Sequence, residues 1–128
     1  MDATVTAPPE PALSTLADLP FHVAGRFPKP LLVGRATAEG IRGWSTAQFF
    51  DRVRDAALGL LGLGLARGDR LAIVSESRPD WLVADLATLT LGGVTVPIYP
   101  TLAPAQARYI ARDAGARFAV ASTVEQAR

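Results

Sequence analysis

Few side chains in this sequence could take part in catalysis. The 128 residues include no cysteine, one histidine (His22) and one lysine (Lys29). Without cysteine there is no disulfide, no thiolate metal site and no cysteine nucleophile. A histidine acts as a general base only when a neighbouring group orients it, and His22 has no such partner in the sequence around it. The acidic residues show neither metal-ligand spacing nor an obvious carboxylate pair. The sequence therefore predicts no catalytic residue and no metal site.

One glycine pattern resembles a nucleotide-binding fingerprint. Gly62, Gly64 and Gly68 have the spacing G-x-G-x-x-x-G. In a dinucleotide site such glycines follow a strand and precede a helix, whose N-terminus then faces the pyrophosphate. Here they follow a predicted helix and precede a predicted strand. We interpret Gly62 and Gly64 as left-handed stops that cap the helix and Gly68 as part of a turn, and we predict no cofactor-binding residue in this chain.

Other conspicuous residues have structural interpretations. Asp69, beside Arg70, is predicted to be a turn residue rather than a catalytic acid. Trp44 and Trp81 are predicted to be packing residues.

Polar residues follow three predicted parallel strands at their carboxyl ends. These segments are 75–77, 99–101 and 122–123. Ligands of α/β proteins bind at this edge of the sheet, although polar loops are expected there in any such fold. Both interpretations stay open at this point.

The elements that would position these loops form an α/β unit. Segment 68–101 predicts a turn, a buried strand at 71–74, a helix begun by Pro79, a stop at Gly92-Gly93 and a second strand at 94–99. A further helix over 105–114 and a third buried strand over 117–121 follow. The predicted buried residues of this helix are Ala107, Tyr109, Ile110 and Ala114. Thr123 then caps the start of another helix. The order predicts a parallel sheet with helical crossovers.

The first half of the chain is predicted to support this unit. Residues 1–13 are proline-rich and predicted to be a flexible leader. A short helix, with its pattern interrupted by Pro20, is expected to about residue 26. A hairpin or a pair of edge strands is expected from runs 31–36 and 41–44. Ser45 or Thr46 caps the next helix. Its apolar residues, spaced by three and four, predict one buried stripe: Phe49, Phe50, Val53, Ala56, Ala57, Leu60 and Leu61.

Composition narrows the classes of function. Hydrophobic residues make up 49% and charged residues 20%, and the net charge is +1. This balance fits a globular core and gives no field that would attract nucleic acid. The longest apolar run, 56–66, is about half of the roughly 20 residues that a membrane-spanning helix needs. The N-terminus lacks the basic and apolar regions of a signal peptide.

Several segments together resemble one family, the AMP-forming acyl-activating ligases. The resemblance runs from about residue 16 to residue 128. Within that family, the elements Ser75–Trp81 and Ile98–Thr101 are most similar to the long-chain fatty acyl-CoA synthetases, which usually carry asparagine where Ser77 stands. The remaining matching segments are Trp44-Ser45-Thr46, Leu63-Gly64-Leu65, Arg67–Ile73 and Gly92–Pro97.

This resemblance implies a two-step ligase reaction. A fatty carboxylate attacks ATP, with Mg²⁺, to give an acyl-adenylate, and coenzyme A then displaces AMP. The family places its chemistry on a Ser/Thr/Gly-rich loop with a lysine, on a later acidic motif and on a C-terminal domain with another lysine. None of these is present, and Lys29 matches neither family lysine. We therefore expect residues 14–128 to be a partial N-terminal adenylation domain, truncated at its C-terminal end, that is inactive alone and binds ATP, Mg²⁺ and coenzyme A at most weakly.

Two rival interpretations stay open. Within the family, the enzyme could use another acid or pass its adenylate to a carrier protein. In another class, the chain could be a stand-alone α/β module that binds a nucleotide or a protein. The resemblance implies a cytoplasmic protein whose partners are its fatty acid, ATP and coenzyme A substrates. Peripheral membrane contact and a homodimer are left open.

Overall fold

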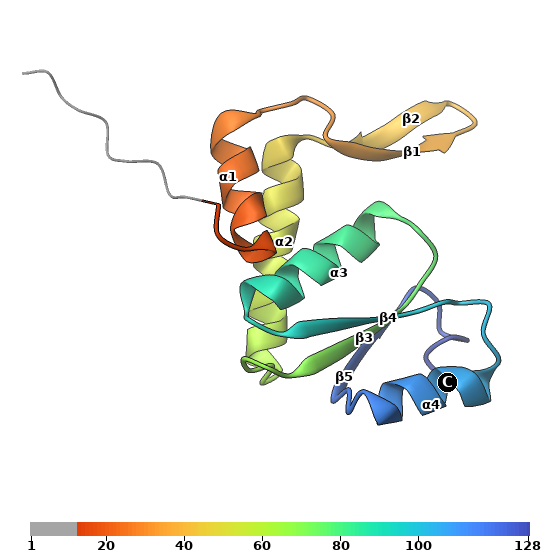
Figure 1. Ribbon diagram of the computed structural model, residues 1–128. Helices are drawn as coiled ribbons and strands as arrows, with labels where there is room; N and C mark the ends of the chain where they lie inside the picture. Colours follow the sequence, from red (N-terminus) through yellow and green to blue (C-terminus); the bar gives the residue numbers. More distant parts are fainter. Residues whose placement is uncertain (1–12) are drawn as a thin grey trace, which may run out of the picture.

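The computed structural model describes residues 13–128, and the predicted leader 1–13 lies almost wholly outside them. A three-stranded parallel sheet has helices on both of its faces (Figure 1). The strand order is β4-β3-β5, formed by β3 (Arg70–Val74), β4 (Val94–Ile98) and β5 (Phe118–Ala121). The predicted α/β fold with a parallel sheet is confirmed.

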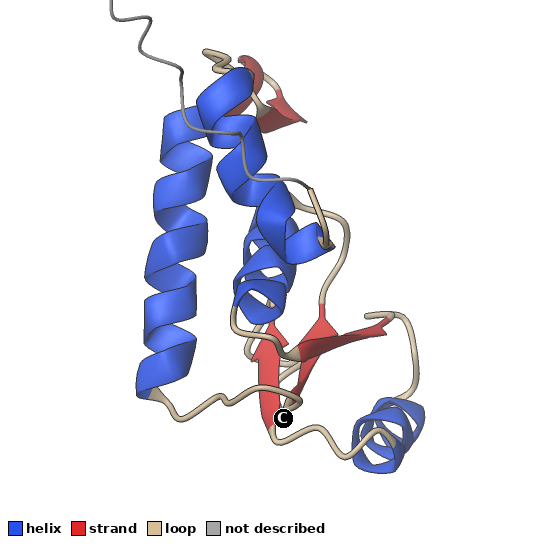
Figure 2. Ribbon diagram, turned by 60° about the vertical axis from the view of Figure 1, so that its left-hand side comes forward, coloured by secondary structure: helices blue, strands red, loops and turns tan. Residues whose placement is uncertain are grey.

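Two crossover helices connect these strands. The helix α3 (Pro79–Thr90) joins β3 to β4, and α4 (Pro104–Asp113) joins β4 to β5. Because β4 and β5 pair with opposite sides of β3, the two crossovers run to opposite sides of the central strand. Figures 1 and 2 both place α3 and α4 on opposite faces of the sheet. The face that carries α3 also carries the long helix α2 (Thr46–Gly62).

A hairpin and two short helices complete the fold. The 3₁₀ helix η1 (Leu16–Asp18) leads into α1 (Leu19–Arg26), and β1 (Val33–Thr37) pairs antiparallel with β2 (Gly40–Trp44). The predicted early helix and hairpin are confirmed. Pro20 lies in the first turn of α1 and is buried, so it starts this helix rather than interrupting it, because a missing N–H costs nothing in a first turn.

Two adjacent hydroxyl side chains at the start of α2 have different roles. Ser45 is the cap: its Oγ accepts from the Gln48 N–H at 3.2 Å, and Gln48 Oε1 accepts from the Ser45 N–H at 3.0 Å. This is a reciprocal capping box. Thr46 instead is buried, donates to the Phe27 carbonyl at 3.1 Å and accepts from the Lys29 N–H at 2.8 Å. It thereby fixes the connection between α1 and the hairpin against α2.

The core lies between α2, α3 and the central strand. One cluster of buried side chains, Phe49, Val53, Ala57 and Ala87, joins α2 to α3. A second cluster consists of Leu71 and Ile73 of the central strand β3 and of Leu65, which precedes that strand. Most of the predicted α2 stripe is therefore confirmed, but Leu61 is 55% exposed, because no element lies beside that part of the helix end.

Three further local predictions are wrong. Of the two glycines predicted to stop α2, Gly62 is instead its last helical residue, and only Gly64 has a left-handed backbone, with φ of 89°. The strand β5 is not buried on both faces, since Ala119 and Val120 are exposed at the sheet edge. Tyr109, predicted to be buried on α4, is 68% exposed. The last two errors share a cause, because burial requires a neighbouring element and none covers these positions.

The segment after β5 forms turns rather than the predicted helix. Its predicted cap contact is nevertheless present, since the Gln126 N–H donates to Thr123 Oγ1 at 3.2 Å. Among the described residues, no helix combines the length and hydropathy required to traverse a bilayer.

Candidate functional site

The three polar segments singled out in the sequence lie together at the carboxyl edge of the sheet. Parallel pairing aligns Val74 of β3 with Ile98 of β4 and with Ala121 of β5. The loops that follow these residues therefore leave the sheet side by side. We call residues 75–78, 99–102 and 122–126 the carboxyl edge. The expectation that this edge gathers polar side chains is confirmed.

A hydrogen-bond network connects the loops after β3 and β5. The Ser122 hydroxyl oxygen lies 2.7 Å from Glu76 Oε2 and 2.7 Å from Gln126 Oε1. The ionised carboxylate is the stronger acceptor for its single proton. Gln126 Oε1 also accepts from the Ser122 backbone N–H at 3.2 Å, and that loop begins with the Ser122 N–H donating to the Val74 carbonyl at 3.1 Å. Two segments 46 residues apart in sequence are thereby joined.

Glu76 is held in its ionised form. The hydrogen bond from Ser122 is the largest of the effects that lower the pKa of the Glu76 carboxyl. Its own backbone N–H and the positive charges of Arg78 and Arg35 act in the same direction, and partial desolvation opposes them. A carboxyl with a lowered pKa is a weak base and is deprotonated at neutral pH. Glu76 therefore suits a fixed negative charge better than proton transfer.

Arg78 lies beside Glu76 at this edge, and its guanidinium is paired with carboxylates. It is the residue before α3, whose first position is Pro79. Its Nε donates to Asp80 Oδ2 at 3.0 Å and its Nη1 lies 3.5 Å from Glu76 Oε1. Two carboxylates thus neutralise one guanidinium. Asp80 also stabilises the positive end of the helix dipole.

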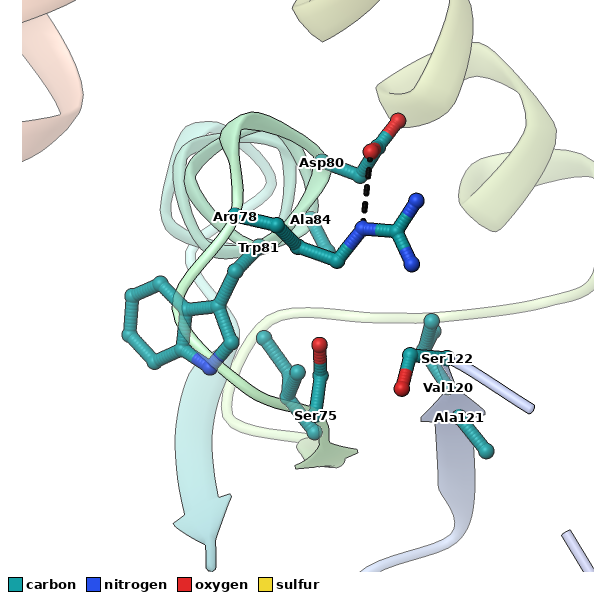
Figure 3. A pocket seen from close by; sticks show the side chains of 9 residues that line it. Ser75, Arg78, Asp80, Trp81, Ala84, Val120, Ala121 and Ser122 are labelled. Carbon is teal, nitrogen blue, oxygen red and sulfur yellow. Dashed lines mark hydrogen bonds and ion pairs between the residues drawn. The ribbon is translucent and has the colours of Figure 1, made fainter. Parts of the chain in front are cut away.

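Two hollows adjoin at the carboxyl edge. A cavity of about 230 Å³ lies between the ends of β3 and β5 and the first turn of α3, with Arg78 and Asp80 on one side and Ser75 and Ser122 on the other (Figure 3). A second cavity, of about 550 Å³, lies between the ends of β3 and β4. Ser75 and Trp81 line both. Trp81 therefore lies at the boundary of the two, in addition to its predicted packing against the core.

The residues of this edge do not form catalytic machinery. Its hydroxyl groups have no histidine beside them, because His22 lies on α1, with its ring centroid 6.3 Å from that of Phe27. In residues 13–128 no group of three or more histidine or acidic side chains could hold a metal ion.

The same residues do not fit a triphosphate. A phosphate-binding loop presents backbone N–H groups and an unpaired cation at a helix N-terminus. Here α3 begins with Pro79, which has no N–H, and carries Asp80 in its first turn. The nearby Arg78 is paired with two carboxylates. The glycine segment 62–68 is likewise a cap and turn, as predicted, since it follows α2 and precedes β3.

Asp69 has the structural role predicted for it. Its carboxylate accepts from the Ala66 N–H at 2.9 Å and from Arg117 at 3.0 Å. Asp69 therefore lies at the amino ends of the strands, and the carboxyl edge lies at their other end. Trp44 also packs as predicted, against the α2–α3 cluster.

Sequence reasoning missed two features near this edge. It did not predict the contact between Glu76 and Ser122, because local patterns carry no signal for a pair 46 residues apart. It also gave no role to Arg35, which the hairpin places close enough to lower the pKa of Glu76. A same-face pair of arginines in the predicted hairpin, at positions 35 and 42, was the available signal.

The fold and the edge together define an α/β domain whose polar loops gather at the carboxyl ends of a parallel sheet. The model of the family described as AMP-binding enzyme matches residues 22–128. The chain belongs to this family.

Curated relatives refine the comparison. The long-chain-fatty-acid–CoA ligase FadD15 of Mycobacterium bovis is 43% identical over 77 residues, which cover 60% of this chain and 13% of that protein. The peroxisomal long chain acyl-CoA synthetase 7 of Arabidopsis thaliana is 32% identical over 112 residues, or 84% of this chain and 16% of that protein. The chain thus spans only a small part of the length of the relatives it matches.

Solved structures share the fold. The N-terminal subdomain of Klebsiella oxytoca NpsA matches 84% of this chain and 27% of its own chain, with a TM-score of 0.74 at 23% identity. NpsA in complex with 3-hydroxyanthranilyl-AMSN matches 90% of this chain and 23% of its own, with a TM-score of 0.78 at 23% identity. These likenesses show that the chain shares the fold of the N-terminal subdomain of NpsA.

Proposed function

We propose that this chain is the opening part of the adenylation domain of an ATP-dependent long-chain fatty acid–CoA ligase. In that role, residues 14–128 form a scaffold layer and other parts of the enzyme supply the reacting groups. The observation that carries the proposal is the 43% identity to a ligase of this type. The elements Ser75–Trp81 and Ile98–Thr101 resemble the same branch of the family.

The complete enzyme would join a fatty carboxylate to coenzyme A in two steps. ATP and Mg²⁺ would form the acyl-adenylate, and the thiol of coenzyme A would then displace AMP. This chain would contribute the carboxyl edge of the sheet, where α/β proteins hold their ligands. We place the protein in the cytoplasm, with its substrates as partners and any membrane contact peripheral.

The chain on its own would be inactive. Transition-state charge in adenylate formation requires donors and a cation aimed at the phosphate. Arg78, the guanidinium at the start of α3, is neutralised by Glu76 and Asp80. This supports a scaffold role for the 128 residues.

The test compares two proteins side by side. The 128-residue chain and the product of its complete reading frame are each incubated with ATP, Mg²⁺, palmitate and coenzyme A. We expect acyl-CoA and AMP only from the second. Acyl-CoA from the 128 residues alone would contradict the scaffold role. Acyl-adenylate that reacts with a carrier protein but not with coenzyme A would favour the rival adenylating enzyme.

A further inference from the structure

A groove separates the hairpin from the start of α3. Its volume is about 700 Å³, which is within the range of small-molecule sites. One wall comes from the hairpin segment 32–35 and the other from the segment 77–82. Most of the lining side chains are apolar: Leu32, Val33, Pro79, Trp81 and Leu82. The groove therefore offers an apolar surface between two elements that are far apart in sequence.

Two arginines without a partner lie on the groove side of the hairpin. Arg35 lines the groove, and Arg42 is its direct cross-strand partner, so both side chains project from the same face. Both are exposed. Within residues 13–128 neither guanidinium has a hydrogen bond or an ion pair, whereas Arg78 on the opposite wall is paired twice. Like charges placed directly opposite destabilise a hairpin, so the hairpin gains nothing from this pair.

The hairpin end of the molecule is positively charged. Residues 26–44 contain four basic side chains and one acidic side chain, although the chain as a whole has a net charge of only +1. The charge of Arg35 also reaches Glu76 across the groove. The hairpin side of the rim therefore attracts anions, while the walls of the groove favour an apolar chain.

We propose that this groove binds a long-chain carboxylate, with its alkyl chain along the apolar walls and its head group on Arg35 and Arg42. The planar guanidinium matches a carboxylate through two parallel hydrogen bonds. The ligand class rests on the proposed function, since a fatty acid is the substrate of such a ligase. The groove adjoins the two carboxyl-edge cavities, with which it shares Ser77, Arg78 and Trp81, and it would hold the substrate beside them.

The test follows the indole N–H signals of Trp81 and Trp44 in the 128-residue chain by NMR, assigned with Trp81→Phe. Dodecanoate is added below its micelle-forming concentration. We expect a saturable shift of the Trp81 signal, because this indole lines the groove. Arg35→Gln and Arg42→Gln should each weaken binding roughly tenfold, the value of a charged hydrogen bond. Arg112→Gln on α4 is the matched control and should leave the dissociation constant unchanged.

Several results would overturn the proposal. The first is an absence of saturable shifts. The second is an affinity of the Arg35→Gln and Arg42→Gln variants for dodecanoate equal to that of the parent chain. The third is binding of dodecanol, which has the alkyl chain without the charge, as tight as that of dodecanoate. Binding to anionic phospholipid vesicles that dodecanoate does not displace would assign the surface to a membrane instead. The dispersion of the amide signals shows whether each variant is folded. If the complete protein forms no acyl-CoA, the ligase proposal fails while this binding result stands by itself.

Discussion

The two ends of the parallel sheet differ in how fully their polar groups are used. At the amino ends, backbone and side-chain bonds join every strand: the Val94 N–H donates to the Asp69 carbonyl at 2.8 Å, and the Arg117 N–H to the Arg70 carbonyl at 3.1 Å. Arg70 also donates to the Ala114 carbonyl at 2.8 Å. The Asp69–Arg117 ion pair closes the same end.

The carboxyl ends are open by comparison. The backbone bond from the Ser122 N–H to the Val74 carbonyl and the side-chain contact between Ser122 and Glu76 join two of the three loops, and cavities lie between the ends of the strands. Tyr99 is 78% exposed. One end of the sheet is therefore built for stability, while the other leaves polar groups and space for a ligand or for further protein. This is the division of roles expected when a scaffold carries its site at the carboxyl ends of its strands.

Truncating a buried side chain at the amino end should have the largest effect. Leu65 is 1% exposed and Tyr99 at the other end is 78% exposed. We expect Leu65→Ala to lower the free energy of unfolding by about 2–5 kcal/mol, because it removes apolar contacts and leaves a cavity. Tyr99→Ala should change it by about 0.5 kcal/mol or less. Urea denaturation measures both.

A matched leucine controls for residue type in that experiment. Leu63 is 74% exposed, two positions from Leu65, so Leu63→Ala should resemble Tyr99→Ala. Similar losses for Leu65→Ala and Tyr99→Ala would remove the distinction between the two ends.

Asp69→Asn should reveal the ion pair at the amino end through pH. The Ala66 N–H, followed by Arg117 and Arg70, lowers the pKa of the Asp69 carboxyl in the folded protein, with desolvation opposing. The resulting stability is present above the unfolded pKa and is lost as the pH falls through the folded one. The variant should therefore be less stable than the parent at pH 7, and the gap should narrow below about pH 4.

Thermal unfolding at several pH values measures this gap, and Asp113→Asn, at an exposed site on α4, is the control. A gap that stays constant from pH 7 to the acid range would show that Asp69 does not act through its charge.

Removing the side-chain contact between Ser122 and Glu76 should have a smaller, local effect. In Ser122→Ala the pKa of Glu76 should rise toward its ordinary value, because the hydroxyl that lowers it most is gone. Carboxyl carbon chemical shifts, followed against pH, measure this change. Ser77→Ala is the control, since Ser77 lies one residue from Glu76 and makes no side-chain contact with it. An unchanged Glu76 titration in Ser122→Ala would show that the two loops are not joined.

The sequence was sufficient for those elements whose signals are local. The spacing of Phe49, Val53 and Ala57 predicts the buried face of α2, and Pro79 and Gly92 bracket α3. A run of apolar residues at 71–73 identifies the central strand, which pairs on both sides. Each of these signals acts within a few residues, through helix periodicity, caps and turns.

Burial at the periphery could not be read in the same way. The pattern of β5 suits a central strand, yet β5 is an edge strand, and Tyr109 on α4 has no neighbour to cover it. Whether such residues are buried depends on which element lies beside them. The carboxyl edge shows the same limit: the strand order predicts that its loops meet, but not that Ser122 selects Glu76.

Amide hydrogen exchange, resolved by residue, tests the contrast between the two ends most directly. The Val94 and Arg117 N–H groups at the amino ends donate to backbone carbonyls, and we predict that they exchange nearly as slowly as the amides within β3. The amides of Glu76, Ser77 and Thr101 at the carboxyl edge should exchange several orders of magnitude faster, through local opening. Equal protection at both ends would contradict this account of the sheet as a stable base with an open functional edge.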